Sequence, residues 1–91
     1  MNVVEEQKVL AVEVLIDETM DHTDAKAVVS IGGSSYTGWG RARRNPADDF
    51  VPKIGEEIAT SRALSDLAHK LLDAAAGVIE QREGHPVRVH E

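Results

Sequence analysis

The sequence contains no cysteine, few aromatic residues and no long apolar run. Without cysteine, the chain forms no disulfide and no thiolate metal site. Tyr36, Trp39 and Phe50 are its aromatic residues, so aliphatic side chains and alanine must build the core. No apolar run approaches the roughly 20 residues that a membrane-spanning helix needs. Basic residues are also in the minority: the net charge is −6, whereas nucleic-acid-binding domains are usually basic.

Length and composition predict one small domain over residues 1–91. Of the 91 residues, 42% are hydrophobic, which is enough for a modest core. The amino-terminal residues MNVVEEQKV include an early acidic pair and lack the basic and then apolar pattern of a signal peptide. We therefore expect a soluble cytoplasmic protein that does not enter a membrane.

Alternation with period two predicts three strands, at about residues 8–17, 24–31 and 35–44. The first strand carries an aliphatic residue at every second position on one face: Leu10, Val12, Val14 and Ile16. The third strand ends at the Asn45-Pro46 pair, because proline has no amide hydrogen for the ladder.

The second and third strands are predicted to form a hairpin with one face of small residues. Across the four-residue turn GGSS we pair Ile31 with Tyr36, which places Lys26 opposite Arg41. The face expected to carry a helix presents Tyr36, Gly38, Gly40 and Ala42. The outer face presents Thr37, Trp39, Arg41 and Arg43.

After the third strand the sequence changes to a helical period and predicts a helix at about residues 56–82. Its apolar stripe comprises Leu64, Leu67, Ala68, Leu71, Ala75, Val78 and Ile79. Asp66, Asp73 and Glu80 recur on its solvated face, and Ser65 and Asp66 are also expected to hold the preceding loop by structural hydrogen bonds. At 1.5 Å per residue the helix is roughly 40 Å long. A short sheet cannot cover that length, so the distal half needs a partner, most simply a second copy of the chain.

The predicted fold is therefore α+β, with a three-stranded antiparallel sheet followed by one long carboxy-terminal helix. Gly84 and Pro86 end the helix. The tail HPVRVHE, residues 85–91, is either a short extra strand or an irregular end, and its pattern is too brief to decide between them.

The run GWGRARRNPADDFVPKIGEEIATSRALSDLAHKL resembles the signature of a family of short actinobacterial proteins of unknown function. Its motifs are Gly-x-Gly-x-Ala-Arg, Asn-Pro-Ala-Asp, Ile-Gly-Glu-Glu and Arg-Ala-Leu-Ser-Asp-Leu, and Ser61 stands where alanine is common. The resemblance implies a β-β-β-α fold similar to double-stranded-RNA-binding domains and to ribosome-hibernation factors. It also implies frequent self-association and a link to stress or dormancy. It carries over no catalytic or ligand residue.

The sequence departs from true RNA-binding domains in two respects. Such domains place lysines at the start of their final helix to hold phosphates. Here we place Glu56 and Glu57 in the first helical turn, where acidic residues favour the helix dipole but repel phosphate. Such domains also have a helix before the sheet, and MNVVEEQ is too short to form one.

Five residues are candidates for contact with an anion or a nucleic acid: Lys26, Trp39, Arg41, Arg43 and Arg44. In the predicted register, Lys26 and Arg41 form a like-charged pair, which destabilises a sheet unless an anion lies above it. Trp39 beside them could stack on a base. Alternatively, Asp24 and Glu13 neutralise the cluster, or a partner subunit supplies the acids.

The other motifs are interpreted as structural. Gly38-Trp39-Gly40 lies inside a predicted strand, whereas a dinucleotide fingerprint needs a strand, a turn and a helix with a third glycine. No two histidines have the helical spacing of a zinc motif. No serine has a partnered base in view. We expect no metal, no cofactor and no enzymatic activity.

Two functions from different classes follow. The first is a non-catalytic homodimeric interaction module with a stress- or dormancy-related role. Its candidate self-association residues are Val9, Leu15, Val28, Trp39, Leu72 and Ile79. The alternative is an RNA- or ribosome-associated factor that binds through the local arginine and lysine strip.

Overall fold

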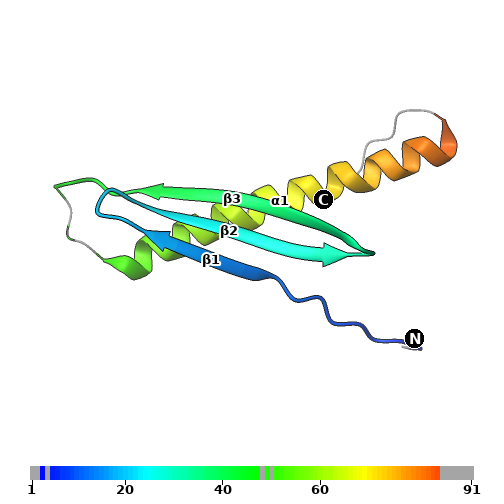
Figure 1. Ribbon diagram of the computed structural model, residues 1–91, viewed down its shortest axis with the longest axis horizontal. Helices are drawn as coiled ribbons and strands as arrows, with labels where there is room; N and C mark the ends of the chain where they lie inside the picture. Colours follow the sequence, from blue (N-terminus) through cyan, green and yellow to red (C-terminus); the bar gives the residue numbers. More distant parts are fainter. Residues whose placement is uncertain (1–2, 4, 48, 50, 85–91) are drawn as a thin grey trace.

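A computed structural model of the protein describes residues 3, 5–47, 49 and 51–84. Three antiparallel strands are followed by one long helix, which confirms the predicted α+β fold class (Figure 1). The strands β1 (Glu13–Glu18), β2 (His22–Ile31) and β3 (Ser34–Arg43) lie in that order across the sheet, and α1 (Pro52–Glu83) crosses one face of it. The tail at 85–91, left open between a strand and an irregular end, lies outside the described residues.

The structure agrees with the predicted end of the helix but not with its predicted start. The predicted start at 56 is wrong, because α1 begins at Pro52, whose missing amide hydrogen costs nothing in the first turn. Glu56 and Glu57 therefore lie beyond the first turn, which contains no acidic residue. The other end agrees: Gly84 adopts φ 73° and its N–H donates to Glu80 O at 2.7 Å.

The turn between β2 and β3 is tighter than predicted. Gly32 and Gly33 form the whole turn, with φ of 57° and 83°, and Ile31 pairs directly with Ser34. Positive φ at both central positions is what a two-residue hairpin turn of the primed type requires, because its twist matches that of the strands. The four-residue turn predicted from GGSS is therefore wrong.

The shorter turn changes the register but not the faces of the hairpin. The predicted partner of Lys26 was Arg41, whereas the observed partner is Trp39, and Arg41 lies opposite Asp24. The register is shifted by two residues relative to the prediction. Because side chains alternate with period two, an even shift leaves every side chain on its predicted face.

Small residues on the inner face of β3 allow α1 to approach closely, as predicted. A Cβ atom at Gly38 would lie 2.5 Å from Leu67 N and nearer still to the carbonyl oxygen of Ala63. One at Gly40 would collide with the backbone of Ala59 and Ala63. The buried core comprises Ala25, Ala27, Val29, Ala42, Ala59, Ala63 and Leu67.

Candidate interaction surface

No described element covers the outer face of the sheet, because α1 lies against the opposite face (Figure 1). The pairing of the strands arranges its side chains in cross-strand rows. The central row consists of Leu15, Lys26 and Trp39. The flanking rows are Glu13, Val28 and Thr37 on one side, and Asp17, Asp24 and Arg41 on the other.

The central row is apolar at both ends. Leu15 is 47% exposed and Trp39 is 59% exposed. Between them, the Lys26 ammonium lies 5.4 Å from the centroid of the Trp39 ring, within the range of a cation–π contact. The lysine thus covers part of the indole without shielding it, and the row keeps a large apolar surface in contact with solvent.

Arg41 forms a paired, bidentate contact with Asp24. Arg41 Nε donates to Asp24 Oδ1 at 2.6 Å, and Nη2 donates to Oδ2 at 3.0 Å. The hydrogen bond from Arg41 lowers the pKa of Asp24, and the same bond raises the pKa of Arg41. The predicted opposition of Lys26 and Arg41 is therefore wrong. Of the two acids expected to neutralise the arginine cluster, Asp24 binds Arg41, whereas Glu13 lies opposite Val28.

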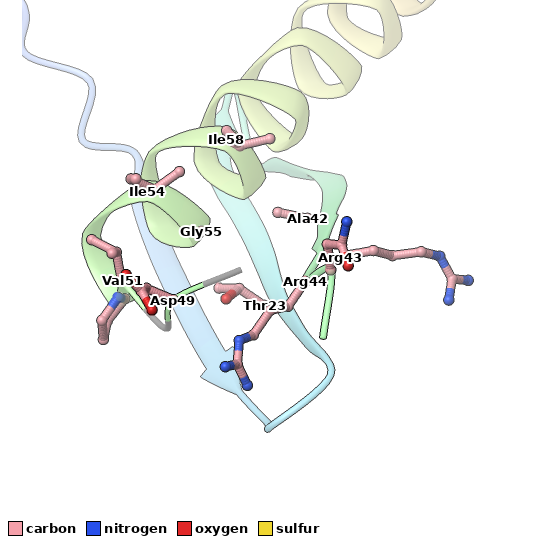
Figure 2. A pocket seen from close by; sticks show the side chains of 11 residues that line it. Thr23, Ala42, Arg43, Arg44, Asp49, Val51, Ile54, Gly55 and Ile58 are labelled. Atoms are coloured by element: carbon pink, nitrogen blue, oxygen red, sulfur yellow. The ribbon is translucent and has the colours of Figure 1, made fainter. Parts of the chain in front are cut away.

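The remaining arginines of the candidate cluster diverge. Arg43 pairs with His22 across the sheet and lies on the outer face with Lys26 and Trp39. Arg44 follows the end of β3, and its Nη1 donates to Met20 O at 3.2 Å, in the connection between β1 and β2. Figure 2 shows the Arg43 and Arg44 side chains pointing in different directions. The five candidate residues therefore do not form one continuous strip.

Side chains of α1 close the outer edge of β3. Asp66 Oδ2 accepts the Trp39 N–H at 2.8 Å, and Lys70 Nζ donates to Thr37 O at 2.8 Å. Arg62 Nη1 donates to Arg41 O at 2.7 Å. The Trp39 N–H is the main cause that lowers the pKa of Asp66, and Lys70, 2.9 Å away, adds to it.

The sequence predicts a structural hydrogen bond from Asp66 but places its partner in the loop before the helix. The observed partner is the Trp39 N–H at the β3 edge. A signal was present in the sequence: Arg62, Asp66 and Lys70 recur at four-residue steps beside the stripe of Ala59 and Ala63. Such a row lies next to the packed stripe on an α-helix.

The self-association residues predicted from the sequence lie in separate places. Leu15, Val28 and Trp39 share the outer face. Val9 precedes β1, whereas Leu72 and Ile79 lie in the distal half of α1, where both are partly buried. The structure thus brings together half of the predicted set and leaves the helix positions on another surface.

A cavity of about 340 Å³ lies between the start of α1 and the end of β3 (Figure 2). Its apolar lining includes Ala42, Val51, Ile54 and Ile58, and its polar lining residues are Thr23, Arg43, Arg44, Asn45 and Asp49. No nucleophile paired with a base lies among these lining residues.

The described residues also bear on metal binding and on membrane insertion. No group of three or more histidine, aspartate or glutamate side chains there could hold a metal ion. The helical residues of the described part include no segment that is both apolar and long enough to cross a bilayer.

The similarity of this chain to known proteins extends over all four elements of the fold. The family model described as Rv2632c-like matches residues 8–88. Uncharacterized protein Rv2632c of Mycobacterium tuberculosis is 44% identical over 80 residues, covering 88% of this chain and 86% of that protein. Uncharacterized protein Mb1767 of Mycobacterium bovis is 41% identical over 78 residues, covering 86% of this chain and 83% of that protein. The crystal structure of Rv2632c superimposes with a TM-score of 0.82 at 41% identity, covering 90% of this chain and 98% of that one.

Proposed function

This chain belongs to the Rv2632c-like family, and we propose that it is a non-catalytic interaction module that binds a second copy of itself through the outer face of its sheet. One observation carries the proposal: the central row of that face keeps Leu15 and Trp39 exposed on a sheet whose other face is packed. An antiparallel sheet that faces water on one side normally presents polar side chains there. A partner that covers this row would remove its apolar surface from solvent.

The charges around the central row suit a second copy as that partner. Acidic and basic side chains lie on opposite sides of this face, with Glu13 and Asp17 on β1 and Arg43 on β3. A two-fold axis that runs parallel to the strands, in the plane of contact, places the acidic side of one copy against the basic side of the other. Such complementarity fixes the orientation of the pair more than it raises the affinity.

The test measures the mass of the assembly and the exposure of Trp39, the single tryptophan of the chain. Light scattering over a range of concentrations should give a dimer or a larger assembly, and iodide should quench Trp39 poorly in it. Leu15→Glu should lower the number of copies and increase quenching, because it introduces a charge into the contact. Leu64→Glu, which changes an exposed leucine of α1, should do neither.

The proposal has a clear contrary result. A chain that stays monomeric at high concentration, with tryptophan open to the quencher, would overturn it. So would an assembly that Leu64→Glu dissociates and Leu15→Glu leaves unchanged. In that case the helix, and not the outer face, would carry the contact.

A second candidate function is favoured by the combination of exposed Trp39 with Lys26 above its ring and Arg43 on the same face. An aromatic ring beside cations is a common platform for single-stranded RNA. Against it, Arg41 is neutralised by Asp24, and further acidic residues share the face. We expect no RNA or ribosome association at low salt. Association that salt weakens and Arg43→Glu abolishes would replace the first function with this one.

The stress- or dormancy-related role implied by the family resemblance stays a prediction. It concerns when the protein acts, and no described side chain bears on it.

A further inference from the structure

The two long edges of the sheet differ in a way that points to a second contact surface. At the β3 edge, Arg62, Asp66 and Lys70 bind the outward backbone groups. β1 forms the other edge, and β2 is the one strand beside it among the residues that the structure describes. An edge without a partner presents a row of N–H and C=O groups to other chains.

The pairing of the strands shows which backbone groups the β1 edge presents. The backbone N–H of Trp39 points away from β2, since it donates to Asp66 at the outer edge of β3. In antiparallel ladders the backbone groups of successive residues face alternate neighbours. Lys26, the partner of Trp39, therefore directs its backbone groups toward β1, and its next partner, Leu15, directs its own toward β2. The backbone groups of Val14, Ile16 and Glu18 then point outward from β1.

The residues before β1 extend this open edge. The sequence predicts a strand from residue 8, but the structure pairs β1 only from Glu13 onward. Residues 8–12 run on from β1 and diverge from β2, and no described strand pairs with them (Figure 1). Val9 is 88% exposed and Val12 is 45% exposed. A segment with strand-forming residues and exposed aliphatic side chains is thus left unpaired at the open edge.

We propose that residues 8–18 pair antiparallel with the same residues of a second copy, across a two-fold axis at Glu13. The two sheets then become one continuous sheet, with both helices on the same side. This inference rests on the self-association proposed above, but not on the outer face, which the edge contact leaves uncovered. Edge pairing alone gives a dimer. A face contact in addition would join such dimers into a larger assembly.

The register follows from the residues that it brings together. With the axis at Glu13, Lys8 lies opposite Glu18, an opposite-charge pair that occurs twice. In the isolated chain, the Lys8 ammonium lies 3.7 Å from a Glu6 carboxylate oxygen, and both side chains are exposed. Between these charges, on the side of the helices, Leu10 pairs with Ile16.

The same register matches the remaining positions. Val12 lies opposite Val14 on the helix side, where α1 covers β2 and β3 rather than β1. Ala11 lies opposite Leu15 on the outer face. All pairs keep their parity, so no side chain changes face. One unfavourable contact remains, because Glu13 meets its own copy at the axis, and like charges directly opposite destabilise a ladder.

A pair of proline substitutions tests the edge directly. Val12→Pro removes an N–H from the proposed ladder, whereas Ala11→Pro removes one that faces the other way. Both positions precede β1, so neither change removes a hydrogen bond of the isolated fold. We expect Val12→Pro to lower the number of copies in the assembly, measured by mass photometry and light scattering, and Ala11→Pro to leave it unchanged.

Charge exchange tests the register. Lys8→Glu and Glu18→Lys should each weaken the assembly by about fivefold in Kd, and the double variant should restore it. Glu13→Gln should strengthen it, because it removes the repulsion at the axis. Failure of the double variant to recover would overturn the register.

The outcomes separate this inference from the proposed function. An assembly whose size is unaffected by Val12→Pro overturns the edge contact and leaves self-association intact. A wild-type chain that is monomeric overturns both. An assembly that Val12→Pro reduces while Leu15→Glu does not supports the edge and removes the outer face as a contact.

Discussion

The two faces of the sheet differ in whether another part of the chain packs against them. The inner face of β3 contains glycines at 38 and 40, and the backbone of α1 lies against them. The outer face of the same strand contains Trp39 and Arg41, and no element of the described part covers it. Adjacent residues thus differ between close contact with the backbone of α1 and an aromatic side chain that is 59% exposed. Folding therefore depends on the inner face, whereas the outer face is available for contact with other molecules.

The largest expected effect comes from adding side-chain atoms to the inner face. Gly40→Val would place atoms inside the backbone of α1, and overpacking of this kind costs about 3 kcal/mol or more. Thr37→Val introduces the same residue on the outer face, where we expect a change within about 0.5 kcal/mol. Urea unfolding at one fixed chain concentration measures both. Equal effects would contradict the comparison of the faces.

Removing atoms from the core is expected to have the next largest effect. Leu67 is 3% exposed and packs against β3, so Leu67→Ala should destabilise the fold by about 3 kcal/mol. Leu64 lies on the same helix and is 42% exposed, so Leu64→Ala should cost about 1 kcal/mol or less. If the two variants unfold at the same urea concentration, the predicted difference between packed and exposed helix positions is wrong.

The contact of Asp66 with the β3 edge should make the stability of the fold depend on pH in acid. The pKa of Asp66 is lowered below its ordinary value of 3.8, because the folded chain stabilises its charged form. Its contribution to stability is therefore fully present above about pH 4 and is lost as the pH falls through the lowered value. Asp66→Asn should weaken the pH dependence of unfolding below pH 4, measured by thermal melts at successive pH values. An unchanged acid slope would contradict this assignment.

The smallest effect on folding is expected on the outer face itself. Trp39→Ala removes an exposed ring and its contact with Lys26, which should cost about 1 kcal/mol or less. Its effect on the mass of the assembly should be larger, because the ring lies at the centre of the proposed contact. A variant that unfolds readily but still associates would reverse the roles assigned to the two faces.

Particular residues show how far the candidate surface could be predicted. Alternation alone placed Lys26, Trp39 and Arg43 on the outer face, and the structure agrees. It could not show that Asp24 binds Arg41, because that pairing depends on the register set by the turn at Gly32 and Gly33. It also could not direct Arg44, which follows the end of β3, where alternation no longer applies.

The order of the elements, the faces of the strands and the small residues that admit the helix can all be predicted from the sequence. These properties are local, since they follow from the period of side chains along one segment. The register of the hairpin, the start of pairing in β1 and the closure of the β3 edge by Asp66 become visible only in the folded chain. Each of these depends on the distance between segments far apart along the chain, which turn geometry and packing set together.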